Sequence, residues 1–118
     1  FSLPKKSEEE KTARHQAIQD ATKYATEVPF RTMNLCYNCM EVAKAMAEIG
    51  NPNSVTDAGV GALAARSGVI GAYLNVKINA VGLDDKEFAQ DIIGQGEKIV
   101  ALANQLEAEI LEIVNSKI

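Results

Sequence analysis

The sequence predicts an all-α protein, an antiparallel bundle of four long helices that forms part of a larger helical bundle. Three observations lead there. Apolar residues recur at spacings of three and four, breaks rich in proline or glycine divide the chain, and no pair of segments alternates as β-strands do. The composition agrees, because 47% of the residues are hydrophobic but only 5% are aromatic. Such a core consists of small aliphatic side chains, which suit closely packed helices.

The first two predicted helices meet at Pro29. The first runs from about Ser7 to Glu27, because Ser7 and Glu10 have the spacing of a capping box at a helix N-terminus. Pro29 either ends this helix or opens the next one, which runs to Ile49. One stripe of the second helix is predicted to face the core, because its apolar residues recur at helical spacing: Leu35, Cys39, Val42, Met46 and Ile49.

The third predicted helix, Ser54 to about Val81, carries little charge and several glycines. Each glycine costs a helix about 1 kcal/mol relative to alanine, so we predict a central helix where Gly68 and Gly71 allow close approach. The fourth helix begins at Asp84 or Asp85. Its seam repeats every seven residues: Ile92, Ile99, Leu106 and Ile113. Four helices of this size cannot hide so much apolar surface, which predicts a homodimer or larger oligomer.

Charge and hydropathy exclude several classes of protein. The net charge of −4 argues against a nucleic-acid partner. No apolar run approaches the ~20 residues that span a bilayer, so no membrane segment is expected. No charged segment followed by an apolar one marks secretion, and the expected location is the cytoplasm.

Cys36 and Cys39 form a C-x-x-C pair within a helical pattern. Such a pair can be a redox site or half of a zinc site. A four-ligand zinc site cannot be assembled here, because there is no second pair and the only histidine, His15, lies in another segment. We therefore predict two packed thiols and no metal site.

A stripe of small and polar residues on the third helix is the best candidate for a site. Its members fall within ~80° of the helix circumference: Asp57, Gly61, Ala64, Gly68, Gly71, Asn75 and Asn79. The stripe is either a groove wall for a flat ligand or a face for close helix packing, and the pattern alone favours packing. Asp57 and Asn75 are ~27 Å apart in a straight helix. They would hold opposite ends of a long ligand, or a partner subunit would bring in the second residue.

Two stretches of the chain resemble one enzyme family. Phe1-Ser2-Leu3-Pro4-Lys5 is similar to the F-x-L-P-K element of the formiminotetrahydrofolate cyclodeaminase and methenyltetrahydrofolate cyclohydrolase family. The run from Gly50 to Asp84 resembles the same family, including the segments at residues 51–60 and 71–79. The resemblance implies a helical bundle, a dimer and a folate substrate, with no cofactor.

The resemblance also implies an activity and a set of site residues. Catalysis is assigned to Asp57 and Lys5, and substrate binding to Ser54, Asn75 and Asn79. The leading prediction is a cyclodeaminase that closes 5-formiminotetrahydrofolate to 5,10-methenyltetrahydrofolate with loss of ammonia. The alternative is a cyclohydrolase that converts the methenyl form to 10-formyltetrahydrofolate, and a second alternative is a non-catalytic helical assembly module.

The family usually has a further helical portion ahead of F-x-L-P-K. Residues 1–118 are therefore expected to be the C-terminal part of the family domain, with its N-terminal portion absent.

Overall fold

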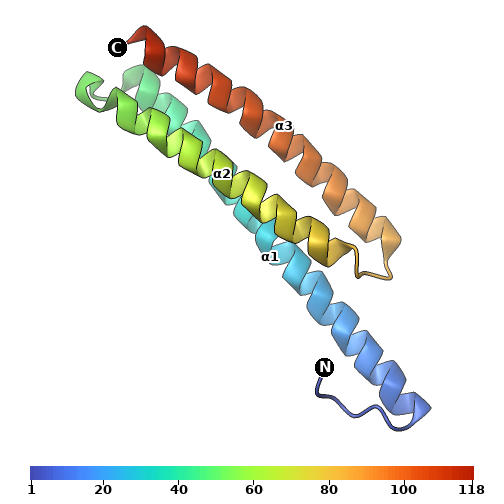
Figure 1. Cartoon of the computed structure of the whole chain (residues 1–118). Helices are drawn as coiled ribbons and strands as arrows, with labels where there is room; N and C mark the ends of the chain where they lie inside the picture. Colours follow the sequence, from blue (N-terminus) through green and yellow to red (C-terminus); the bar gives the residue numbers. More distant parts are fainter.

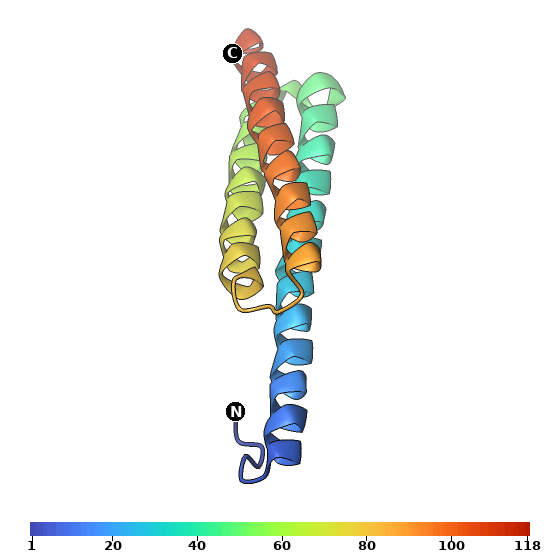
Figure 2. The same ribbon diagram turned by 90° about the vertical axis from the view of Figure 1, so that its right-hand side faces the viewer.

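The computed structural model describes residues 1–118 as three long helices. They are α1 (Glu8–Ile49), α2 (Val55–Ala80) and α3 (Lys86–Ser116), with a short 3₁₀ helix at Pro52–Ser54. Consecutive helices run antiparallel, and the chain measures 68 × 24 × 15 Å (Figure 1). The N-terminal part of α1 projects beyond the other two helices, and the first residues fold back beside it (Figure 2). The all-α prediction is confirmed, but the predicted number of four helices is wrong.

The helix count is wrong because α1 continues through Pro29. Proline has no backbone N–H, so the carbonyl of Ala25, four residues earlier, lacks its usual helical donor. The side-chain amide of Asn79 on α2 supplies one, with Nδ2 3.0 Å from the Ala25 oxygen. This contact joins residues that are 54 positions apart, so local sequence gives no sign of it.

The helix ends follow the capping chemistry of the sequence. The Oγ of Ser7 accepts from the backbone N of Glu10 at 3.0 Å, which confirms the first helix start. Asp85 rather than Asp84 caps α3, because its carboxylate accepts from the backbone N of Phe88 at 3.0 Å. Asp84 instead pairs with His15 of α1, which ties the α2–α3 loop to the first helix.

The core consists of apolar rows at seven-residue spacing. α1 contributes Met33, Met40 and Ala47, and α2 contributes Val55, Ala62, Val69 and Val76, all 5% exposed or less. The predicted seam of α3 is confirmed in part, since Ile92 and Leu106 are buried while Ile99 and Ile113 are half-buried. These rows hold the three helices together where they lie side by side.

The predicted core-facing stripe of α1 is wrong, because its members lie on the surface. Leu35 is 65% exposed, Val42 61% and Ile49 81%, and Cys39 is also exposed. Helix α1 carries two apolar rows with the same spacing, and the row that contains Met33 and Met40 is the buried one. Periodicity alone cannot choose between them.

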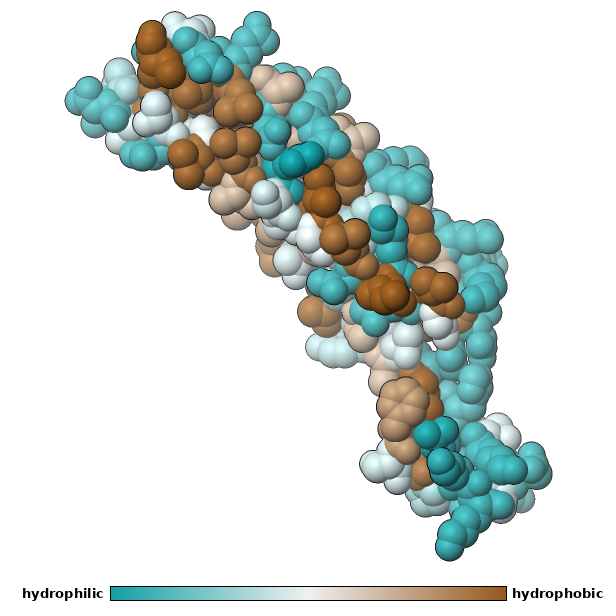
Figure 3. All heavy atoms as spheres, in the orientation of Figure 1, coloured by the Kyte–Doolittle hydropathy of each residue, from teal (hydrophilic) through white to brown (hydrophobic).

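Apolar side chains remain exposed on α2 as well. They are Val60, Leu63, Leu74 and Ile78, and Val81 directly after the helix is exposed too. Figure 3 shows hydrophobic side chains over the upper and middle parts of one face, whereas the projecting lower end is largely hydrophilic. No helix combines the length and the hydropathy needed to cross a bilayer.

Candidate functional site

The predicted groove wall on α2 faces open space over most of its length. A Cβ atom added at Gly61 or Gly71 would meet no atom within 4 Å. A Cβ at Gly68 would lie 2.8 Å from the Sγ of Cys36. The close approach predicted for Gly68 is therefore confirmed, whereas that predicted for Gly71 is wrong. Close packing, which the pattern favours, is observed at Gly68, whereas Gly61 and Gly71 border open space. That a ligand binds along this face stays a prediction.

Ser54 and Asp57 share a hollow at the C-terminal end of α1. Its volume is about 510 Å³. Ser54 is the N-cap of α2 but makes no side-chain capping bond, and Asp57 lies in the first turn with its carboxylate exposed. The other lining residues come from both helices and the turn between them: Cys39, Val42, Ala43, Met46, Gly50, Asn51, Ala58 and Gly61. A carboxylate and a hydroxyl thus face an otherwise largely apolar space.

Asn75 and Asn79 share a second hollow further along the same two helices. Its volume is about 520 Å³, and the remaining lining residues are Ala25, Val28, Pro29, Thr32, Gly68, Gly71 and Ala72. The Nδ2 of Asn79 donates to the backbone oxygens of Ala25 and Asn75, each at 3.0 Å. The nitrogen of this predicted substrate-binding residue therefore has a structural role.

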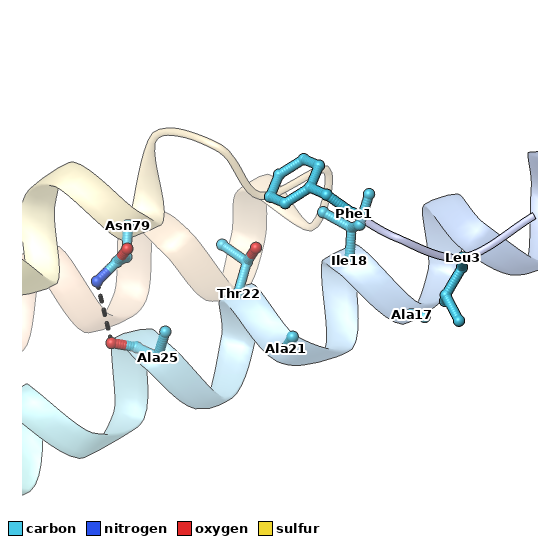
Figure 4. Close-up of a pocket in the computed structure, with 8 residues that line it drawn as sticks. All are labelled: Phe1, Leu3, Ala17, Ile18, Ala21, Thr22, Ala25 and Asn79. Carbon is cyan, nitrogen blue, oxygen red and sulfur yellow. Dashed lines mark hydrogen bonds between the residues drawn. The ribbon is translucent and has the colours of Figure 1, made fainter.

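A third hollow adjoins the second at Ala25 and Asn79. Its volume is about 410 Å³, and Phe1, Leu3, Ile18 and Thr22 contribute to its walls (Figure 4). The N-terminal segment is held there by Arg14, whose Nη2 donates to the Phe1 oxygen at 3.2 Å and whose guanidinium lies 5.6 Å from the Phe1 ring centroid. Lys5 belongs to this segment and is exposed.

The structure brings four of the five predicted site residues together as two pairs, and Lys5 lies apart from both. Lys5 precedes the N-terminus of α1, whereas the hollow with Asp57 lies at its C-terminus. The helix between them has 42 residues, or ~63 Å at 1.5 Å per residue. Within one chain, Lys5 and Asp57 cannot act on the same atom.

Sequence reasoning missed the part played by Pro29 and the Ala25 carbonyl in this groove. The available signal was a proline inside an otherwise helical pattern. Such a proline predicts a helix boundary, but the side chain of Asn79 on another helix supplies the donor that replaces its N–H.

Comparison with known proteins identifies the family. The sequence profile of formiminotransferase-cyclodeaminase matches residues 1–98. The chain belongs to the formiminotransferase-cyclodeaminase family. This confirms the family that residues 1–5 and 50–84 indicated.

Individual relatives bear the names of two enzymes of this family. A methenyltetrahydrofolate cyclohydrolase from Methylorubrum extorquens is 43% identical over 118 residues, which are all of this chain and 57% of the relative. Formimidoyltransferase-cyclodeaminases are 31% identical over 101 residues in Dictyostelium discoideum and over 117 in Gallus gallus, which are 86% and 99% of this chain. These alignments cover 19% and 22% of the two relatives. The chain thus spans little more than half of the cyclohydrolase and about a fifth of the other two.

Proposed function

We propose that this chain is part of a methenyltetrahydrofolate cyclohydrolase, the alternative among the activities that the sequence predicted. The observation that carries this choice is the 43% identity over the whole chain with a protein of that name. The formimidoyltransferase-cyclodeaminases are 28–33% identical. The cyclodeaminase therefore becomes the second candidate.

The proposed reaction adds water to a cation. The water oxygen forms a bond to the methenyl carbon, the bond from that carbon to N5 breaks, and 10-formyltetrahydrofolate forms with net release of one proton. A carboxylate can act as the base that takes the water proton, and it can also stabilise the cationic substrate. Asp57 is the groove carboxylate suited to both tasks. The chemistry requires no metal or cofactor, and none is proposed.

We propose that residues 1–118 form the C-terminal part of the family domain. The resemblance of residues 1–5 to an element that usually follows a further helical portion supports this proposal. The alignment covers all of this chain and 57% of the cyclohydrolase. The open α1–α2 groove is consistent with a site to which other parts of the protein contribute.

We also propose that a second copy of the chain completes the site. Leu35, Cys39, Val42, Met46 and Ile49 alternate in spacings of four and three, as core positions of a coiled coil do, so two such stripes are self-complementary. The residues that flank the stripe, Cys36, Asn38, Ala43 and Ala45, carry no charge and cause no repulsion. An antiparallel partner would place its Asn75 hollow near the Asp57 hollow of the first copy. The separation of Asp57 and Asn75 within one chain, ~27 Å along α2, supports this arrangement.

The activity is tested with the complete natural protein and one chromophore. The cyclohydrolase consumes methenyltetrahydrofolate, so its absorbance should fall faster with protein than in buffer alone. A cyclodeaminase given 5-formiminotetrahydrofolate would instead raise the same absorbance and release ammonia. The first result is expected. The second would replace the cyclohydrolase by the cyclodeaminase. If neither absorbance change is observed, the non-catalytic assembly module remains.

The shared site is tested by mixing two inactive variants, Asp57→Asn and Asn75→Ala. In a mixed antiparallel dimer one site receives an intact Asp57 and an intact Asn75, and the other site loses both. Co-expression should therefore restore about a quarter of the wild-type rate, since half of the dimers are mixed and each has one intact site. A mixture as inactive as each variant alone would place both residues in a site within one chain.

The association surface is tested by Leu35→Glu combined with Ile49→Glu. Two charges in the exposed stripe should shift the protein from dimer to monomer in sedimentation at micromolar concentration, because burial of an unpaired carboxylate is unfavourable. Leu102→Glu is the matched control, since Leu102 is 49% exposed but lies on α3. Dimers that persist in the double variant would move the interface to another face.

A further inference from the structure

The groove contains a backbone carbonyl that its own helix cannot satisfy. Pro29 removes the N–H that would normally bond to the oxygen of Ala25, and Asn79 replaces it with Nδ2 at 3.0 Å (Figure 4). A side chain from α2 thus completes the hydrogen bonding of α1. The hydrogen bond lies where the second and third hollows meet, because Ala25 and Asn79 line both.

This replacement of a backbone donor by the Asn79 amide determines which atoms Asn79 can offer to a ligand. A side-chain amide has two N–H donors and one oxygen that accepts. Both donors point to backbone oxygens, those of Ala25 and Asn75. The amide is thereby held in one orientation, and the oxygen Oδ1 remains for other partners.

We propose that Pro29 and Asn79 form a positioning pair in which Pro29 commits the Asn79 nitrogen to the Ala25 carbonyl and leaves Oδ1 as a fixed acceptor for a ligand N–H. This rests on the proposed function for the identity of the ligand, which would be a reduced pterin with its ring N–H groups. Pro29 lines the hollow that holds Asn75 and Asn79. Gly71 lines it too, and the space next to Gly71 is open. Pro29 therefore determines that Asn79 offers an acceptor rather than a donor to the ligand, and it does so without contacting the reacting atoms.

The coupling between the two residues is tested by a double-mutant cycle in the complete natural protein. Pro29→Ala restores an N–H for the Ala25 carbonyl, so Asn79 is no longer needed as its donor. With Pro29 present, Asn79→Leu should lower the folding equilibrium constant about tenfold, because a carbonyl loses its only donor. In the Pro29→Ala background, the same change should cost less than about threefold.

Equal losses in the two backgrounds, measured by urea unfolding, would overturn the pairing. Amide hydrogen exchange gives a second measurement if the transition is not two-state. Asn79→Leu should speed exchange around residues 25–33 only when Pro29 is present, and faster exchange in both backgrounds would again contradict the pairing.

The acceptor role is tested in the Pro29→Ala background, where structural need for the Asn79 donor is removed. Asn79→Asp keeps an acceptor oxygen and Asn79→Leu does not. The KM for methenyltetrahydrofolate should rise about tenfold in the Leu variant, the value of one hydrogen bond of average strength, with kcat little changed. It should stay near the Pro29→Ala value in the Asp variant.

Equal KM values in the Asp and Leu variants would show that the oxygen does not bind ligand. Binding of tetrahydrofolate, followed by calorimetry, separates this result from failure of the proposed function. If the unsubstituted protein binds tetrahydrofolate but does not turn over the methenyl form, the same comparison is made on Kd. If it binds no folate, the acceptor proposal fails together with the proposed function, whereas the coupling stands or falls on the folding measurements.

Discussion

Replacement of Gly96 by alanine is expected to lower the free energy of unfolding by about 2–3 kcal/mol, at the upper end of the range for an overpacked core. The new Cβ would lie 2.6 Å from Cε1 and 2.7 Å from Cδ1 of Tyr73. These distances are far below van der Waals contact, so the ring or the helix must shift. Denaturation with urea measures the loss.

Tyr73 has little freedom to move away from such a clash. Its side chain is buried, and its hydroxyl donates to the carbonyl of Ile93 at 3.3 Å. The ammonium of Lys77 lies 4.7 Å from the ring centroid. Burial, with a smaller effect of the nearby Glu97, raises the pKa of Tyr73, so the hydroxyl stays protonated and remains a donor at neutral pH.

Gly94→Ala is the matched control for this prediction. Gly94 lies on the same helix, but a Cβ there would meet no atom within 4 Å. Alanine should therefore raise stability by about 0.5–1 kcal/mol, because glycine is the poorer helix former. If Gly96→Ala were as stable as Gly94→Ala, the Tyr73 ring would be free to move and would not fix the α2–α3 distance.

Replacement of Asp57 by asparagine is expected to lower turnover of methenyltetrahydrofolate at least ~100-fold, the usual worth of a positioned base. Asparagine has nearly the same shape but cannot take a proton or stabilise a cation by charge. Unfolding free energy should change by less than ~0.5 kcal/mol, because Asn and Asp are similar near a helix start. Both quantities are measured on the complete natural protein.

Asp91→Asn supplies the control for the loss of one negative charge. Asp91 is an exposed carboxylate on α3 that accepts a hydrogen bond from Gln95 and lies outside the three hollows. Its variant should keep turnover within about twofold, since a distant exposed charge is screened. Full activity in a stably folded Asp57→Asn protein would leave Asp57 with a structural role only and would direct the search for the base elsewhere.

Local chemistry made several features of the fold predictable. Ser7 and an aspartate at the start of α3 were recognised as caps because a cap acts within three residues of the chain. Gly50 and Asn51-Pro52-Asn53 separated α1 from α2 for the same local reason. The stripe from Asp57 to Asn79 was recognised as one helix face because helical spacing is fixed.

The candidate site was predictable only in part. The sequence indicated which polar residues share a face of α2, and the structure places four of the five predicted site residues in two hollows beside it. It did not indicate that Gly71 borders open space while Gly68 contacts Cys36. That difference depends on how close α1 lies to each glycine, and the sequence of α2 does not contain this information. The close packing of Gly96 against Tyr73 was missed for the same reason.

The sequence by itself determined that this protein is helical, where α2 and α3 begin, and to which family it belongs. These properties depend on spacings and motifs within short stretches of chain. Only the tertiary structure decided that α1 passes through Pro29, which row of α1 is buried, and that Lys5 lies far from Asp57. Each of these depends on a contact or a distance between residues remote in sequence. The amide of Asn79 at the carbonyl of Ala25 is the clearest case, because a side chain on α2 supplies the donor that Pro29 removes from α1.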